Sequence, residues 1–275
     1  MPDTFTALAP AMAEQILEKL GFASPPLPDE AGLSAIYRAW CQSVPFDNLR
    51  RRLMTDNDSA LPLPGTTAAD FFSHWLKYGT GGTCWAGHGA LYALLTHLGF
   101  SVQFGLSTML SPRPAPPGSP GHGMLFINLD TRTLVVDSTL LHGSPLPLAS
   151  GHNPHPVWGT HVHERDGSWC IHWKPLGRTW LDCKILATNI SVDAFQSRHQ
   201  QSRSNSRFDG ALLIRRASTE SISGIVKGER VVRDSQGKET FTPLSRSEQH
   251  RLLIEDYGIA EEVVTRLPAD DPSHG

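Results

Sequence analysis

The hydrophobic pattern of this chain changes once, near Phe100, and this change restricts the fold more than any other feature. Before it, apolar residues recur at helical spacing, as Phe71 and Trp75 do on one side of a helix predicted over residues 67–77. After it, alternating residues predict strands, and Asp166-Gly167 is a strong hairpin-turn signal. Helices followed by antiparallel strands predict an α+β fold class.

The order of these patterns predicts three lobes. Residues 1–99 form a helical lobe, residues 100–190 an antiparallel β lobe, and residues 191–275 a smaller α/β lobe with a frayed tail. The junction between the first two lobes lies just behind Cys84. We find no internal repeats, so the lobes are expected to pack together as one protein.

The composition excludes several classes of partner. The chain contains 24 Lys and Arg against 27 Asp and Glu, a formal charge of -3, whereas a nucleic-acid or anionic-membrane partner needs a basic excess. No run approaches the roughly 18 apolar residues of a membrane span, and the first residues lack the basic and apolar regions of a secretory signal. Four cysteines are too few for a dense disulfide framework. The expected location is therefore the reducing cytoplasm.

Cys84 follows Gly81-Gly82-Thr83 and is predicted to begin a helix. Unpaired N–H groups and the helix dipole at this position stabilise a thiolate. The two glycines allow a tight turn and leave room for a substrate carbonyl beside the sulfur. The alternative for Cys84 is a small buried apolar residue, which is common for free cysteines.

His122 and Asp137 are predicted at the open ends of two paired strands, over residues 123–129 and 133–136. With the turn centred just after Asp130, positions 122 and 137 share a face, one diagonal step apart, within reach of a hydrogen bond. A carboxylate there orients the imidazole and stabilises the imidazolium formed when His122 takes the thiol proton of Cys84. The alternative for Asp137 is an ordinary residue ending a strand.

Further motifs accompany these three residues along the chain. They are Val44-Pro-Phe-Asp-Asn-Leu49, Gly81-Gly-Thr-Cys-Trp85 with its following helix to Phe100, Ser206-Arg-Phe208, and the helical segment from Ser245 to Ile259. In type and in order, with His122 and Asp137 between them, they resemble segments of the arylamine N-acetyltransferase family. Each motif is short, and their collinearity over roughly residues 10–260 makes the resemblance specific.

The resemblance implies a fold and a reaction. The fold is a helical bundle, an antiparallel β-barrel-like lobe and an α/β lid, with Cys84, His122 and Asp137 at the first interface. The reaction is ping-pong: Cys84 takes the acyl group from acetyl-CoA or another acyl thioester and passes it to a small amine or hydrazine. No metal is expected, and the residues that bind the cofactor are not identified.

The chain departs from the family at three places near the nucleophile. Thr80 stands where the family usually has arginine, and Ala86 where it usually has an acidic residue. After Asp137 the family continues into a Gly-Phe-Gly segment associated with the cofactor pocket, whereas this chain has the bulkier segment Ser138 to Gly143. These changes leave the three reactive groups in place and leave the identity of the donor and acceptor open.

Three alternatives to acetyl transfer therefore remain. One is an amide synthase that takes an acyl chain from a carrier protein, as some family members do. Another is a cysteine hydrolase or transglutaminase-like enzyme, because the same three groups serve amide cleavage and transfer. The last is an inactive binding protein in which the segment after Asp137 closes the pocket.

A histidine-rich hairpin is a separate candidate. A two-residue turn at Asp166-Gly167 places His161, His163, Cys170 and His172 on one face. Four such residues can form a tetrahedral zinc site. The alternative is a solvated polar face in a chain with 13 histidines, and this alternative is preferred because a flat hairpin seldom brings four ligands together without supporting contacts.

Overall fold

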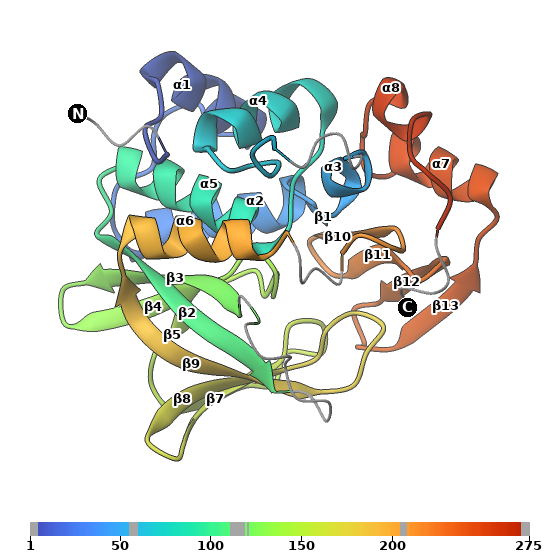
Figure 1. Ribbon diagram of the computed structural model, residues 1–275. Helices are drawn as coiled ribbons and strands as arrows, with labels where there is room; N and C mark the ends of the chain where they lie inside the picture. The colour runs from blue at the N-terminus through green and yellow to red at the C-terminus, as the bar shows by residue number, and fades with distance from the viewer. Residues whose placement is uncertain (1–4, 55–59, 111–118, 120, 204–207, 271–275) are drawn as a thin grey trace.

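A computed structural model describes residues 5–54, 60–110, 119, 121–203 and 208–270 of the chain. Ser206 and Arg207, two of the residues in the family resemblance, lie outside this described part. Figure 1 shows a layer of helices over a strongly curved sheet, with a second, smaller sheet beside them. The predicted α+β class, with its helical bundle, barrel-like lobe and lid, is confirmed.

The helical layer gathers around one central helix. Its members are α1 (Pro10–Lys19), α2 (Glu30–Ser43), α3 (Leu49–Arg52), α4 (Ala68–Tyr78), α5 (Cys84–His97) and, from later in the chain, α6 (Val192–Gln201). The predicted helix over residues 67–77 is α4, in which the Thr67 side chain caps the first turn and Gly79 ends the helix with a φ of 74°. Helix α5 is buried on nearly all sides, so it is enclosed by the helices and the large sheet.

The large sheet is antiparallel and eight-stranded, in the order β5-β4-β3-β2-β9-β8-β7-β6. Its strands are β2 (Val102–Leu110), β3 (His122–Leu129), β4 (Arg132–Val136), β5 (Leu146–Pro147), β6 (Gly151–Asn153), β7 (Thr160–Arg165), β8 (Ser168–Trp173) and β9 (Leu181–Ile190). Strand β3 is buried on both faces: Leu125 and Ile127 belong to the core shared with the helices, and Met124 and Phe126 to the interior of the curved sheet. The apolar run of β3 therefore joins two cores.

Both predicted hairpin registers are confirmed. Strands β3 and β4 pair Leu125 with Val136, which centres their turn just after Asp130. Strands β7 and β8 pair His161 with His172 around the Asp166-Gly167 turn. Asp130, Asp166 and Gly167 all have positive φ values, as such tight turns require.

The lid contains the second sheet, in the order β1-β10-β11-β12-β13, and helices α7 (Arg246–Glu255) and α8 (Glu261–Val264). Its strands are β1 (Phe46–Asp47), β10 (Leu213–Ala217), β11 (Ile222–Val226), β12 (Glu229–Arg233) and β13 (Glu239–Pro243). Because β1 comes from the first part of the chain, the lid is tied to the helical layer through main-chain hydrogen bonds. In the described part of the chain, no helix is long and apolar enough to cross a membrane.

Candidate active site

Cys84 is the first residue of α5 and is 6% exposed. Thr83 precedes the helix without capping it through its side chain, and the first turn contains no acidic residue. Within the described part of the chain, no side chain accepts from the N–H groups at this helix end, so they are available to an anion on or beside the sulfur. The predicted position of Cys84 at a helix start is confirmed.

His122 and Asp137 are brought together as the strand register predicted. His122 Nε2 donates a hydrogen bond to Asp137 Oδ2 at 2.7 Å, and both side chains are buried. The Cys84 thiol is near enough to the His122 side chain to contribute to its raised pKa. Because Asp137 occupies Nε2, the nitrogen left for the thiol is Nδ1. Cys84 and Asp137 thus both neighbour the His122 imidazole, the arrangement that cysteine acyl-transfer chemistry needs.

The electrostatics favour an imidazolium beside a carboxylate. Burial alone lowers the pKa of His122, but the charge of Asp137 and its hydrogen bond outweigh burial and raise that pKa well above 6.5. Burial alone raises the pKa of Asp137, but His122 and His88 outweigh it and hold that pKa well below 3.8. The carboxylate therefore stays ionised at neutral pH and keeps the imidazole proton on Nε2.

The backbone around Asp137 fixes its orientation. Its Oδ1 accepts hydrogen bonds from the N–H groups of Thr139 at 2.7 Å and Leu140 at 3.2 Å. Tyr37, on α2, donates its hydroxyl to the carbonyl of Asp137 at 2.7 Å. With His122 on the other oxygen, the carboxylate has partners on both oxygens, which limits rotation of the side chain.

His88 is a residue of this site that the sequence reasoning missed. It lies one helical turn after Cys84 in α5, and its Nδ1 donates to the Cys84 carbonyl at 2.5 Å. Its Nε2 accepts from the N–H of Ser138 at 3.1 Å and lies 3.3 Å from Asp137 Oδ1. The signal was available, because residues four apart share a face of a helix, so a histidine at that spacing from Cys84 points to the same interface.

The segment after Asp137 fills space instead of leaving it open. Leu140, Leu141 and His142 are buried, and burial lowers the pKa of His142 to about 4. Leu141 has a φ of 53°, a left-handed conformation that is strained for a branched side chain. This packing is consistent with the departure from the family's glycine-containing segment at these positions.

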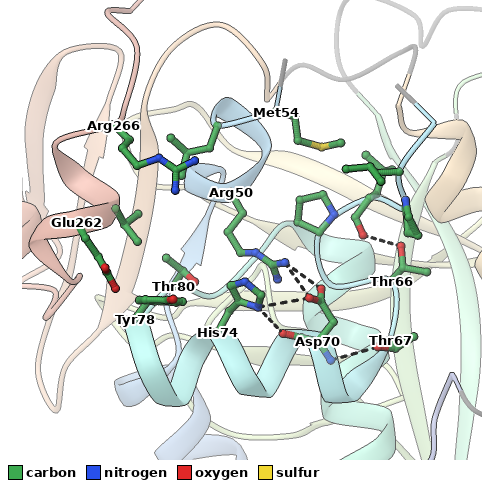
Figure 2. Close-up of a pocket in the computed structure, with 16 residues that line it drawn as sticks. Arg50, Met54, Thr66, Thr67, Asp70, His74, Tyr78, Thr80, Glu262 and Arg266 are labelled. Carbon is green, nitrogen blue, oxygen red and sulfur yellow. Dashed lines mark hydrogen bonds and ion pairs between the residues drawn. The ribbon is translucent and has the colours of Figure 1, made fainter. Parts of the chain in front are cut away.

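Thr80, another of the three departures, lines a cavity of about 600 Å³ between α3, α4 and α8. Figure 2 shows Arg50, Asp70 and His74 linked in this cavity, with Arg266 across from them. Arg50 Nη2 contacts both oxygens of Asp70 at 3.0 Å, whereas the Thr80 hydroxyl is buried with no partner in the described chain. Cys84, His122 and Asp137 do not line this cavity, so it is separate from the candidate active site.

The histidine-rich hairpin has the predicted register but not the geometry of a metal site. His172 Nδ1 contacts Asp182 Oδ1 at 2.7 Å, and its ring stacks on Trp180. Cys170 is buried, whereas His161 is exposed. Among the described residues, the one group of potential ligands close enough for an ion is His88, His122 and Asp137. Those atoms are engaged in the hydrogen bonds given above.

Asp47, in the segment Val44 to Leu49, supports the loop that leads to Cys84. Its carboxylate is buried and accepts from Gly81 N at 2.6 Å and from Leu49 N at 3.0 Å. Phe46 also forms a bridge with Gly82. A Cβ on Gly81 would lie 1.9 Å from the Pro45 carbonyl oxygen, which explains the glycine at this position.

Replacing Asp47 with alanine is therefore expected to destabilise the protein by about 2–4 kcal/mol, since two buried N–H groups lose their acceptor. Asp47→Asn retains one acceptor oxygen and should lose about half as much. Urea unfolding of the three proteins measures the difference. Equal stability of Asp47→Ala and wild type would show that this carboxylate does not support the loop.

The raised pKa of His122 predicts how its protonation depends on Asp137. Burial lowers this pKa, but the charge of Asp137 and its hydrogen bond outweigh burial, so the imidazolium persists above the ordinary titration range of histidine. Asp137→Asn removes that charge, and the pKa of His122 is therefore expected to fall. Titration of the His122 ring signals by NMR in the two proteins measures the change. An unchanged pKa of His122 in Asp137→Asn would contradict the expectation.

The fold and these contacts define a class of protein: an α+β protein with a cysteine at a helix start facing a histidine–aspartate pair on a curved antiparallel sheet. A sequence model of the N-acetyltransferase family matches residues 31–262, and the chain belongs to this family. It is therefore an enzyme of the N-acetyltransferase family, as the resemblance in the sequence predicted. A search of curated protein sequences gave no match.

Solved structures of arylamine N-acetyltransferases have the same fold. The enzyme from M. tuberculosis aligns with a TM-score of 0.77 at 17% identity, over 93% of this chain and 99% of that one. The Mycobacterium marinum enzyme in complex with CoA aligns with a TM-score of 0.75 at 14% identity, over 93% and 98%. An enzyme from Bacillus cereus, described as having a unique Cys-His-Glu catalytic triad, aligns with a TM-score of 0.72 at 16% identity, over 92% and 100%.

Proposed function

We propose that this protein is an N-acetyltransferase that moves an acetyl group from acetyl-CoA to a small aromatic amine or hydrazine through an acetyl-Cys84 intermediate. The observation that supports it most is the hydrogen bond of 2.7 Å between His122 Nε2 and Asp137 Oδ2, with the Cys84 thiol near the same imidazole. Family membership supplies the reaction class. The CoA complex of the M. marinum enzyme supports CoA as the carrier of the acetyl group.

In the first half-reaction, His122 takes the thiol proton on Nδ1, and the thiolate attacks the thioester carbonyl. The C–S bond to Cys84 forms, the C–S bond to CoA breaks, and CoA leaves with the proton from His122. Asp137 stabilises the imidazolium that exists between these steps. The free N–H groups at the start of α5 are placed to stabilise negative charge beside the sulfur.

In the second half-reaction, the amine attacks the acetyl carbonyl. The C–N bond forms, the bond to Cys84 breaks, and the proton of the amine passes to His122 while Cys84 leaves as thiolate. The amide is more stable than the thioester, so the cycle proceeds toward N-acetylation. We also propose that the three groups lie at the junction of a helical lobe (1–99), a β lobe (100–190) and a lid (191–275). The acyl thioester donor is then a cytoplasmic one.

The alternatives have less support. The solved structures named above are acetyltransferases, and none is described as a hydrolase or as a partner of a carrier protein. The presence of Cys84, His122 and Asp137 together argues against an inactive binding protein, because a protein that only binds does not need a thiol beside a histidine–aspartate pair.

The test is to measure release of free CoA from acetyl-CoA, first without amine and then after an aromatic amine is added. The proposal predicts a burst of one CoA per enzyme, followed by steady release only after the amine arrives. Steady release without amine would indicate a thioester hydrolase. Release that begins only when both substrates are present would contradict the ping-pong order.

A further inference from the structure

Arg215 lies in the middle of β10, between β1 and β11, and its neighbours across the sheet are Phe46 and Gly224. It is 7% exposed. Ile214, on the other face of the strand, belongs to the core under α7 and α8, so Arg215 points the opposite way, toward the helical layer. Figure 1 shows β10 beside β1 below the helices, on the side where the lid meets the rest of the molecule.

This guanidinium has no acidic partner in the described part of the chain. Three other arginines are similarly buried, and each contacts a carboxylate: Arg51 with Asp209 at 3.0 Å, Arg52 with Asp270 at 2.9 Å, and Arg233 with Glu239 at 2.5 Å. The Nε of Arg215 is buried without a hydrogen-bond acceptor among the described residues. A buried charge without a counter-ion is costly, so it marks a place where a ligand supplies the missing charge.

Neighbouring residues pack closely around this side chain. A Cβ at Gly224, the facing residue on β11, would lie 2.5 Å from the Ile214 carbonyl oxygen and 3.0 Å from Arg215 Cγ, so a side chain there would crowd both the strand and the arginine. The guanidinium lies 4.4 Å from the centre of the Phe46 ring. Burial, and then the charges of Arg178 and Arg233, lower the pKa of Arg215 to about 10, which leaves it protonated at neutral pH.

Arg215 is also close to the candidate active site. Phe46, its neighbour on β1, forms a bridge with Gly82, two residues before Cys84. The charges of Asp137 and Cys84 both act on the Arg215 guanidinium, as does that of Arg178. Arg178 is exposed, and no hydrogen bond or ion pair of its side chain is found in the described chain. Arg215 is thus near the nucleophile, and in the described chain neither Arg215 nor Arg178 has a counter-ion.

We propose that Arg215, assisted by Arg178, binds a carboxylate carried by one of the two groups that meet at Cys84, the acceptor amine or the transferred acyl chain. This inference rests on the proposed acyl transfer and adds the substrate class. The phosphates of CoA are a less suitable source, because the whole pantetheine arm separates them from the thioester sulfur. The carboxylate is the counter-ion of the guanidinium and accepts charge-assisted hydrogen bonds from it.

The experiment compares substrates that differ by one carboxylate. Aniline and 4-aminobenzoate are the acceptors, each with acetyl-CoA, and acetyl-CoA and succinyl-CoA are the donors in acylation of Cys84. Arg215→Gln is expected to lower kcat/KM for one carboxylated substrate roughly 10- to 100-fold more than for its neutral counterpart. The substrate pair, acceptors or donors, that shows this larger fall in kcat/KM identifies the source of the carboxylate. An equal fall in kcat/KM for all substrates would overturn the proposal and indicate that Arg215 acts on the thiolate.

Arg216→Gln is the matched control. It makes the same charge change on the same strand, but Arg216 points to the other face and lies over the Tyr257 ring. Its effect is expected to be alike for all substrates. Arg178→Gln should reproduce the Arg215 pattern more weakly. Arg215→Met should unfold at the same temperature as wild type or a higher one, since it removes an unpaired buried charge; a fall in Tm would indicate a structural role and contradict the proposal.

A binding measurement tests the same site without catalysis. Benzoate, which has the carboxylate but no amine, is expected to raise the Tm of wild type and not that of Arg215→Gln. Equal shifts in both proteins would overturn the proposal even if no thioester acylates Cys84. Failure of acylation with an intact benzoate effect would instead overturn the proposed acyl transfer and leave the carboxylate site standing.

Discussion

Asp137→Asn is expected to lower kcat for acetyl transfer by roughly 10³- to 10⁴-fold while the protein stays folded. The cause is the tautomer of His122. The asparagine NH₂ would donate to Nε2, which forces the imidazole proton onto Nδ1, the nitrogen that faces Cys84. His122 can then no longer take the thiol proton. Steady-state kinetics with acetyl-CoA and an aromatic amine measure the effect.

Asp182→Asn provides the control for that experiment. Asp182 forms the same kind of contact, at 2.7 Å, with His172 on the histidine-rich hairpin. Its replacement is expected to change kcat less than about twofold, as for surface positions in general. Similar losses in Asp137→Asn and Asp182→Asn would show that the loss comes from general destabilisation and not from the candidate triad.

Cys84→Ala is expected to remove acetyl transfer by at least about 10³-fold, because no other group can form the thioester intermediate. Folding should be retained, since alanine fits the space of the small thiol at the start of α5. Release of CoA from acetyl-CoA, followed with a thiol reagent, measures the loss. Cys170→Ala, which changes a buried cysteine on β8, should retain near-normal activity. Full activity in Cys84→Ala would eliminate the proposed mechanism.

Local sequence signals predicted the parts of the site that depend on neighbouring residues. The turn after Asp130 set the register that brings His122 to Asp137, and the glycines before Cys84 predicted the helix start. Both signals act over a few residues, so side-chain alternation and turn chemistry were sufficient. His88 could have been included on the same basis, through its spacing from Cys84.

Contacts between distant segments could not be predicted in this way. Strand β9 (Leu181–Ile190) lies in the middle of the large sheet, yet its sequence alternates poorly and its pairing with β2 has register shifts near Leu106. Phe46 and Asp47 form β1 by pairing with β10, far along the chain, and no local pattern indicates that partner. Tyr37 reaches Asp137 only because α2 packs beside that loop.

The position of Arg215 shows the same limit. Nothing in the local sequence separates it from Arg216, and the two differ only in the face of β10 on which they lie. Arg215 stands out only by comparison with the other buried arginines, each of which contacts a carboxylate. A sequence pattern can therefore place an arginine in a strand, whereas its pairing depends on the assembled lid.

The most direct test of the proposed function is the intact mass of the wild-type protein after mixing with acetyl-CoA in the absence of any amine, followed by peptide mapping. A gain of one acetyl group is expected, located on Cys84 and lost when an aromatic amine is added. No gain with acetyl-CoA, or an acetyl group on another residue that the amine does not remove, would contradict the proposed role of Cys84.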